Sequence, residues 1–419
     1  QSTGANGDLR VAVVGFRSRG NEHIKELQKI KGVRIVALCD VDSTVLAKGL
    51  KAIPGAKGYT DMRKMLEDKD IDAVSIASPN HQHAIQGIWT LQAGKHLYIE
   101  KPLSHNIFEG QQLVAASNHF SKLIVQAGTQ SRSGAGIRAA IKDVHAGKYG
   151  KVKVSRAICY KRRKSIGPAA KNAIPSEIDY DLWNGPADIQ ESIRGNQTDK
   201  VQQTGSQGSV HYDWHWFWNY GGGDLCNQAI HEIDIARWGL GVNTHPSTIA
   251  ALGGKSFFND DQQFPDTMYC AFEYPGASKE GKAKQLIYEH RIWSPYIQEG
   301  FENGNAFYGT KGMIILGKSA GWQLFGPRNK LIESGKGSPD VAAHHQNFID
   351  CIHSGKLPNG DIAEGHLSAS LAHLANIGCR LNKSFSFDPV MEKVTDLPQA
   401  DKLVRRTYRE GGHWAIPKG

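Results

Sequence analysis

The sequence predicts an α/β protein in two parts: a doubly wound parallel sheet, followed by an α+β region on a mainly antiparallel sheet. In the first 128 residues, short apolar runs alternate with segments of helical spacing, which is typical of βαβ units with helices on both faces of a sheet. Beyond residue 148, strand-like runs follow one another without intervening helices, which favours antiparallel pairing. We therefore expect two domains, over residues 8–128 and 129–419.

The expected strands of the first domain are short and rich in β-branched residues. They cover residues 9–14, 33–39, 71–77, 96–99 and 123–125. Apolar residues recur at helical spacing in 23–30 and 85–89, which predicts helices between these strands. Such an order gives the sheet one edge at which the carboxyl ends of all its strands meet.

The second domain reads differently. Alternating apolar and polar residues predict half-buried strands over 152–160, 268–274 and 285–293, and residues 309–312 predict a hairpin turn. Two stretches rich in Gly, Pro, Asn and Ser, residues 165–207 and 317–340, are expected to be surface loops. Helical spacing returns over 344–352 and 362–381.

Composition narrows the classes of partner. The chain has 419 residues, 40% of them hydrophobic and 22% charged, which is ordinary for a globular protein. No apolar run approaches the roughly 20 residues of a membrane-spanning helix, so we expect no membrane partner. The net charge of +9 is spread along the chain, and its densest basic run, residues 161–164, has no nucleic-acid-binding motif beside it; we expect no nucleic-acid partner. The six cysteines are scattered singly, which favours buried side chains over disulfides or structural zinc.

A glycine-containing turn follows the first strand, directly before a helix. Gly15 permits a sharp turn out of the strand, and Gly20 permits close packing of the helix against the sheet. The backbone around Phe16, Arg17 and Arg19 would then face a pyrophosphate at the helix N-terminus. Arg17 occupies the middle glycine position of the dinucleotide-binding pattern, so a plain strand–turn–helix is the competing interpretation.

Asp40 closes the second strand, about twenty residues after the glycines. An acid at this position accepts hydrogen bonds from the adenosine ribose and repels a 2′-phosphate, which favours NAD over NADP. Arg17 argues in the other direction, because an arginine nearby accommodates that phosphate. A strand-end turn residue is the structural alternative for Asp40. We expect NAD.

Polar residues also follow the next two strands of the predicted sheet. They are Ser78, Pro79, Asn80 and His83 after one strand, and Glu100 and Lys101 after the other. Ligands bind at the carboxyl ends of strands in such sheets, so we expect these residues in the cofactor crevice. Turn chemistry and a surface salt bridge are the alternatives for each motif taken alone.

These motifs in order, together with Gly-Gly-Gly-Asp-Leu-Cys-Asn-Gln-Ala-Ile-His-Glu-Ile-Asp over residues 221–234, resemble the glucose–fructose oxidoreductase/inositol dehydrogenase/rhizopine-catabolism family, Gfo/Idh/MocA. The resemblance implies an N-terminal Rossmann domain and a C-terminal α+β domain with a large, mainly antiparallel open sheet. It also implies NAD(P)-linked oxidation or reduction of sugars, polyols or their derivatives. A homo-oligomer, dimer or tetramer, formed through the open sheet is expected on the same ground.

The resemblance further implies the catalytic residues. Lys101 matches the family's catalytic lysine and His231 its catalytic histidine, while Asn227 stands where many members have an aspartate. An aspartate would stabilise a protonated histidine, whereas Asn227 adds no charge. We expect His231 to accept the substrate proton and Lys101 to stabilise the oxyanion. The alternatives are a proton relay that runs mainly through Lys101, or through a residue that the sequence does not identify.

Aromatic and basic residues are the candidates for substrate binding. In the aromatic run over residues 211–220, Tyr212, His215 and Trp216 are expected to wall the sugar site, with core packing as the alternative. Tyr160, Arg162 and Arg163 end the first strand of the second domain and would bind an acidic group on the substrate, or form a solvated strand end. Asp234, three residues after His231, completes the candidate substrate residues.

The expected function is NAD-dependent hydride transfer at a ring hydroxyl or ketone of a carbohydrate. The main alternative is a glycosidase that works by transient oxidation, elimination, hydration and re-reduction, including on an anionic glycoside. A non-catalytic dinucleotide sensor is a third interpretation. The pairs His81/His83 and His344/His345 have no third ligand at a recognisable spacing, so no metal is expected. The chain begins at Gln1 in a polar stretch, which leaves both an exported, trimmed protein and a cytoplasmic one open.

Overall fold

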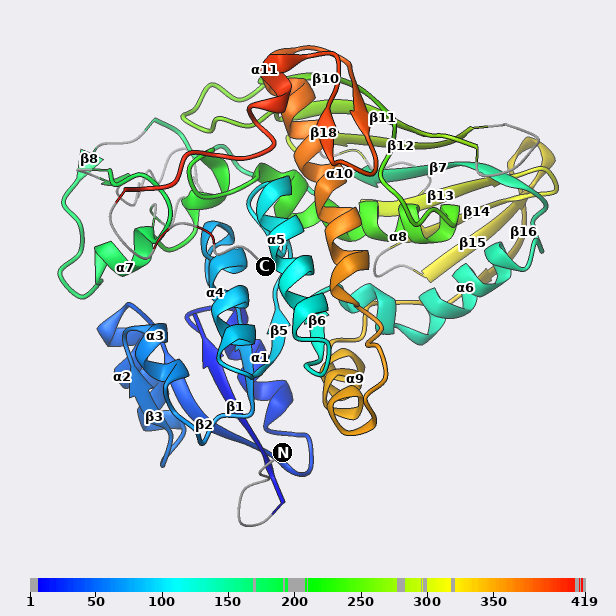
Figure 1. Cartoon of the computed structure of the whole chain (residues 1–419). Helices are drawn as coiled ribbons and strands as arrows, with labels where there is room; N and C mark the ends of the chain where they lie inside the picture. The colour runs from blue at the N-terminus through cyan, green and yellow to red at the C-terminus, as the bar shows by residue number, and fades with distance from the viewer. Residues whose placement is uncertain are drawn as a thin grey trace.

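A computed structural model describes residues 7–168, 171–190, 193–194, 208, 210–276, 283–294, 296, 300–317, 321–410, 414 and 416. The polar N-terminal residues 1–6 and residues 195–207 of the expected first loop lie outside this part of the chain. Two sheets organise the fold (Figure 1).

The first sheet is parallel and has six strands in the order β3-β2-β1-β4-β5-β6. The strands are β1 (Leu9–Val14), β2 (Val33–Cys39), β3 (Lys57–Tyr59), β4 (Ala73–Ile76), β5 (His96–Ile99) and β6 (Val125–Ala127). Four of them confirm the predicted runs, and β6 overlaps the run predicted over 123–125 only at Val125. The edge strand β3 was not predicted, because its three half-exposed or exposed residues carry no strand pattern.

The second sheet has ten strands in the order β16-β15-β14-β13-β7-β12-β11-β10-β17-β18, and only the β7–β12 pair is parallel. The strands are β7 (Val152–Cys159), β10 (Thr248–Gly254), β11 (Thr267–Tyr274), β12 (Lys284–Arg291), β13 (Asn303–Gly309), β14 (Met313–Gly317), β15 (Gly321–Gly326), β16 (Lys330–Gly335), β17 (Phe385–Asp388) and β18 (Lys393–Val394). The predicted strands and the hairpin between β13 and β14 are confirmed.

The loop predicted over residues 317–340 is wrong, because this stretch forms the hairpin β15–β16. Trp322 pairs with Gly335 across it, and a Cβ on Gly335 would lie 2.5 Å from the Trp322 ring. The glycine therefore makes room for an indole, as glycines in strands do, rather than marking a loop. The loop predicted over 165–207 also contains structure, namely the two-residue strands β8 (Lys171–Asn172) and β9 (Ile193–Arg194) and helix α7 (Tyr180–Asn184).

Helices cover both faces of the first sheet and fill the space between the sheets. The helices besides α7 are α1 (Arg19–Leu27), α2 (Ser43–Ala52), α3 (Met62–Leu66), α4 (Asn80–Gln92), α5 (Ile107–His119), α6 (Ala135–His145), α8 (Ile230–Leu240), α9 (Val341–Ser354), α10 (Ile362–Leu381) and α11 (Pro398–Asp401). Figure 1 shows α5 and α10 side by side, and α10 also packs on α8 and β10. The result is a layer of helices between two sheets.

The core crosses the predicted domain boundary. Phe348 and Ile352 of α9 pack against the first sheet, and Trp414 and Ile416 near the C-terminus join its other face. All six cysteines are buried and free, as predicted. Within the described residues, no helix combines the length and hydropathy needed to cross a bilayer.

Candidate active site

A cavity of about 360 Å³ opens at the carboxyl ends of the parallel strands, where segments of the second half reach over the first sheet. Ten of the twelve predicted cofactor residues line it. These are Gly15, Arg17, Arg19, Asp40, Ser78, Pro79, Asn80, His83, Glu100 and Lys101. Strand ends as far apart in the chain as Gly15 and Lys101 are therefore brought to one place, as the parallel order requires.

The two predicted glycines are required by their surroundings. Gly15 has a φ of +70°, and a Cβ there would lie 2.8 Å from the backbone nitrogen of Ser78. A Cβ on Gly20 would run into the carbonyl oxygen of Gly15. Gly20 and Phe16 do not themselves line the cavity: Gly20 packs beneath the turn, and the Phe16 ring is buried against Gly49.

Asp40 is fixed by backbone hydrogen bonds. Its Oδ2 accepts from the Phe16 N–H at 3.0 Å and its Oδ1 from the Asp42 N–H at 3.0 Å. Burial raises the pKa of Asp40 to about 6, although these hydrogen bonds and the charge of Arg17 act in the opposite direction. The carboxyl group is thus ionised at neutral pH, with lone pairs left for a ligand hydroxyl.

The turn before α4 offers further polar atoms. Asn80 begins α4, and its Oδ1 is buried without a hydrogen-bond partner in the described part of the chain. His83 lies between the carbonyl oxygens of Pro102 (2.5 Å) and Ser78 (2.7 Å). Burial lowers the pKa of His83, although the two carbonyls act in the opposite direction. The ring bridges the turns that follow β4 and β5.

Glu100 is held from several sides. Its Oε1 accepts from Arg19 Nε at 2.7 Å, His23 Nε2 at 3.1 Å and Gln130 Nε2 at 3.1 Å. Burial alone would raise the pKa of Glu100, but Arg19 and His23 outweigh it and hold the pKa well below its usual range. The other oxygen accepts from the Lys101 backbone N–H at 3.0 Å. This network fixes the backbone from which the Lys101 side chain extends.

Lys101 is the point at which the two halves of the chain meet. Its Nζ donates a hydrogen bond to the backbone carbonyl of Asn227. Asn227 lies in a single π-helical turn, Leu225–Ala229, that leads into α8, and π turns often occur at functional sites. Asn227 Nδ2 also lies 3.4 Å from the hydroxyl of Tyr212.

The wall opposite the cofactor residues is aromatic. Tyr212, Trp214 and His215 line the cavity, from or next to the 3₁₀ turn Asp213–Trp216. His215 stacks on Trp214 with ring centroids 3.6 Å apart. Its Nδ1 donates to the Tyr212 carbonyl at 2.7 Å, which leaves the lone pair on Nε2. Burial lowers the pKa of His215 to about 3, and the charges of Lys101 and Arg163 act in the same direction.

His231, the expected catalytic histidine, does not line the cavity. It lies on α8, one turn beyond Asn227, is 7% exposed, and is not among the described residues that line the cavity. One helical turn moves a side chain about 6 Å along the axis. Trp216 is likewise buried outside the lining, with the Arg163 guanidinium 5.8 Å from its ring centroid.

The remaining candidates for substrate contact are engaged elsewhere or face solvent. Asp234 forms a buried ion pair with Arg132 at 2.8 Å. Arg163 donates to Asp224 at 2.8 Å through Nε, and Tyr160 is buried beneath another arginine. Arg162 is exposed. None of the four lines the cavity, so the expected binding of an acidic group has no support in their placement.

Sequence reasoning missed several lining residues. Trp183 reaches the cavity from α7, and Trp414 reaches it from the C-terminal segment. The Trp414 ring centroid lies 5.3 Å from the guanidinium of Arg63 and 4.9 Å from that of Arg409. Arg63 follows β3, which pairs with β2, the strand that Asp40 follows. A lone tryptophan far along the chain gives no spacing signal, so only the folded structure places it.

Comparison with known proteins agrees with this architecture. Three models of one family match the chain: an oxidoreductase family, NAD-binding Rossmann fold, over residues 9–128; a GFO/IDH/MocA C-terminal domain over 196–315; and an oxidoreductase family, C-terminal alpha/beta domain, over 327–416. Together they cover most of the sequence.

Individual relatives are more distant. An inositol 2-dehydrogenase of Salmonella typhimurium is 32% identical over 126 residues, covering 30% of this chain and 38% of the relative. A glycosyl hydrolase family 109 protein of Shewanella pealeana is 32% identical over 123 residues, covering 27% of each. The matches thus span well under half the length of these relatives.

A solved structure shares the fold over nearly the whole chain. The WlbA dehydrogenase of Bordetella pertussis, in complex with NADH and UDP-GlcNAcA, superposes with a TM-score of 0.66 at 20% identity, covering 91% of this chain and 99% of that one. The three domain models, the two sheets and the lining of the cavity lead to one conclusion. The chain belongs to the Gfo/Idh/MocA oxidoreductase family, and its first domain is the family's NAD-binding Rossmann domain.

Proposed function

We propose that this protein is an NAD-dependent oxidoreductase that transfers hydride at a ring hydroxyl or ketone of a sugar, polyol or sugar derivative. One observation carries the proposal: Lys101 lies where the dinucleotide-binding turns meet the aromatic wall of Tyr212 and His215. An ammonium at such a junction can contact a substrate oxygen held above the cofactor. A dinucleotide sensor would not need that arrangement.

The residues present fit NAD. The helix α1 turn presents backbone to a diphosphate, and the Asp40 carboxylate can accept from ribose hydroxyls while disfavouring a 2′-phosphate. The unpartnered Oδ1 of Asn80 suits a donor such as a ribose hydroxyl or a carboxamide. When bound, NAD supplies the hydride acceptor, and in its reduced form the donor.

The chain's own groups handle the oxygen and the proton. In the oxidation direction the neutral amine of Lys101 would take the proton of the reacting hydroxyl as hydride leaves, and the resulting ammonium would donate to the product ketone and return the proton to solvent. In the reduction direction the ammonium would stabilise the developing oxyanion and supply the proton. His215, neutral at ordinary pH, would accept through Nε2 from a neighbouring hydroxyl of the substrate and orient it. His231, the acceptor that the family resemblance suggests, remains the competing candidate for the base.

A redox-assisted glycosidase is the second candidate. Trp183, Trp214 and His215 all line the cavity, and Trp214 stacks on His215. Aromatic rings of this kind can pack against a second sugar ring or an aglycone. In that reaction the ring hydroxyl is oxidised, the neighbouring C–H becomes acidic, the aglycone is eliminated, water adds, and the ketone is reduced again. Similarity to a glycosyl hydrolase family 109 protein supports keeping this candidate.

One assay separates the two. The purified chain is incubated with NAD and a panel of free sugars, polyols and aryl glycosides in heavy water, and products are followed by absorbance and mass spectrometry. A dehydrogenase accumulates NADH in proportion to oxidised sugar. A glycosidase releases aglycone without net NADH and exchanges a ring hydrogen. Binding of NAD without turnover on any member of a broad panel would favour the sensor instead.

We further propose that the open face of the second sheet joins copies of this chain. Leu252 and Tyr269 face each other across β10 and β11 and are 63% and 44% exposed. Light scattering after gel filtration should give a dimer or tetramer that Leu252→Glu weakens. Leu357→Glu, at a site 79% exposed outside this sheet, is the matched control. A monomeric wild-type protein would contradict the proposal.

A further inference from the structure

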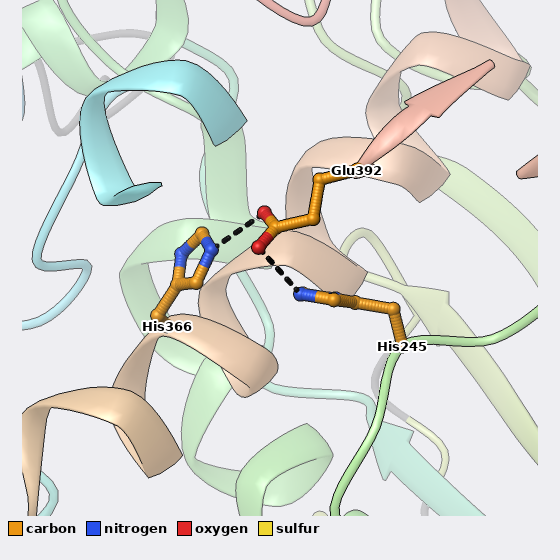
Figure 2. Close-up of side chains that lie close together, drawn as sticks. All are labelled: His245, His366 and Glu392. Carbon is orange, nitrogen blue, oxygen red and sulfur yellow. Dashed lines mark hydrogen bonds and ion pairs between the residues drawn. The ribbon is translucent and has the colours of Figure 1, made fainter. Parts of the chain in front are cut away.

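Three side chains from separate segments of the chain converge on one point (Figure 2). His245 lies between α8 and β10, His366 in α10, and Glu392 in the turn between β17 and β18. His366 Nε2 is 2.7 Å from Glu392 Oε2, and His245 Nε2 is 3.4 Å from Oε1. Both histidines are 4% exposed, and none of the three residues lines the cavity.

The donor set and its geometry suit a divalent cation. One ligand atom from each residue lies within 4.8 Å of the others. Zinc binds imidazole nitrogen and carboxylate oxygen at about 2.0–2.2 Å, so tetrahedral ligands lie roughly 3.3 Å apart and small side-chain rotations close the remaining distance. Two imidazoles and a carboxylate are ligands for zinc rather than for Mg²⁺ or Ca²⁺, which prefer oxygen.

Within the described residues, no ion pair joins Glu392 to an arginine or a lysine. Its side chain is only 17% exposed, and its contacts in the cluster are imidazoles. Arg237, whose charge acts on His245, is committed to Glu364 and to the Val242 carbonyl. Buried carboxylates are usually paired or bound to a metal. A cation between the rings would compensate the charge directly.

The surrounding structure accommodates the ring of His366. Gly110 of α5 faces it, and a Cβ there would run into His366 Nδ1. His245 Nδ1 is buried without a hydrogen-bond partner in the described residues, so its ring is not oriented by a bond on its outer side. The rings of His366 and Phe387 pack edge to face against it, and Nε2 is the nitrogen that faces Glu392.

We propose that His245, His366 and Glu392 form a structural Zn²⁺ site, completed by a water molecule. The ion links the turn between β17 and β18, which carries Glu392, and the segment before β10, which carries His245, to helix α10. The three ligands are separated by more than twenty residues along the chain, which is why no sequence spacing indicates them. The site is separate from the proposed dehydrogenase chemistry and stands or falls independently of it.

The experiment uses the full chain, stripped with a chelator and dialysed. Zinc is titrated against a chromophoric chelator, the melting temperature is followed as free zinc rises, and Co²⁺ is added in place of zinc to read the coordination by its visible spectrum. One zinc per chain, a melting temperature that rises with each tenfold increase in free zinc, and a tetrahedral Co²⁺ spectrum are expected.

Variants locate the ion. His366→Gln and Glu392→Gln should weaken zinc binding by more than about tenfold, since even loss of an outer partner costs that much. His353→Gln, at an exposed position of α9, should leave it unchanged. If one of these variants does not fold, zinc binding by Glu392→Asp and the Co²⁺ spectrum of the wild-type chain still test the proposal: weaker zinc binding and a tetrahedral spectrum support it. The proposal is overturned if the wild-type chain binds less than one zinc ion, or if neither ligand variant changes zinc binding. The three side chains would then be held together by the contacts of Glu392 with the two histidines alone.

Discussion

The two ends of the cavity differ in how they are built. The cofactor end consists of turns that directly follow β1, β2, β4 and β5, so each residue is placed by its own strand. The substrate end draws on the 3₁₀ turn Asp213–Trp216 and the π turn Leu225–Ala229, which meet only through tertiary packing. Residues at the cofactor end can be predicted from the sequence near them, whereas residues at the substrate end cannot. Roles at the substrate end therefore have to be measured rather than transferred from a motif.

The largest expected effect comes from removing Lys101, which lies where the cofactor end and the substrate end meet. Lys101→Ala should reduce kcat by about 10²–10⁴, the usual contribution of a general acid or base, because no other ammonium is predicted to contact the substrate oxygen. The Kd for NAD should change by no more than about threefold, since Asp40 and the α1 turn remain. Steady-state kinetics and calorimetric NAD binding measure the two quantities.

Lys101→Arg is the matched control, because it keeps the positive charge but not the ability to cycle a proton at neutral pH. It should retain NAD binding and recover little of the rate. Near-normal turnover of Lys101→Ala would remove this residue from the mechanism and the proposed function with it.

The second prediction concerns the substrate end. His215 lines the cavity and His231 does not, so His215→Ala should lower kcat/KM by roughly 10- to 100-fold, in the range of a positioned hydrogen-bond partner. His231→Ala should cost less in kcat/KM and more in thermal stability, because His231 is 7% exposed within α8. The reverse order would mean that the family's histidine acts after the wall rearranges on substrate binding.

Most residues of the cofactor end could be predicted from the sequence. Gly15, Gly20 and Asp40 were identifiable because a sharp turn, a close approach and an acid at a strand end are local requirements that few residue types meet. Ten of the twelve cofactor candidates consequently line the cavity. The two exceptions, Phe16 and Gly20, support the turn from within.

Elsewhere the deciding partners are far away in sequence. Arg163 and Asp234 look available for a substrate in the sequence, but Asp224 and Arg132 engage them in the fold. The glycines of residues 317–340 suggested a loop. In the fold, Gly335 instead pairs with Trp322, thirteen residues away, and the Trp322 ring occupies the space that a side chain on Gly335 would need. Periodicity and turn chemistry carry no information about such pairings.

The third prediction uses the acid at the cofactor end. The pKa of Asp40 is raised to about 6 by burial, so lowering the pH from 7 to 5 protonates it and removes an acceptor for ribose hydroxyls. The Kd for NAD should therefore rise roughly tenfold over this range, as expected when only the ionised form binds. In Asp40→Asn the Kd should be higher at pH 7 and nearly independent of pH. A wild-type Kd that does not change between pH 7 and 5 would show that the carboxylate does not contact the cofactor.

The smallest expected effect comes from Trp414, which is far from Asp40 in sequence yet lines the same cavity. Its ring lies near Arg63 of α3, next to the strand that Asp40 follows, and 6.0 Å from Trp89, so we expect it to contact the adenine ring rather than the nicotinamide. Aromatic contacts contribute about 0.5–1.5 kcal/mol beyond buried area, so Trp414→Ala should weaken NAD binding by roughly two- to twelvefold. Nicotinamide mononucleotide, which lacks the adenosine, should bind wild type and variant equally. Trp293→Ala, a half-buried tryptophan near the end of β12, controls for general loss of aromatic packing. Equal weakening of both ligands would mean that Trp414 supports the fold of the crevice, and that even the cofactor end depends on a residue no local rule could have indicated.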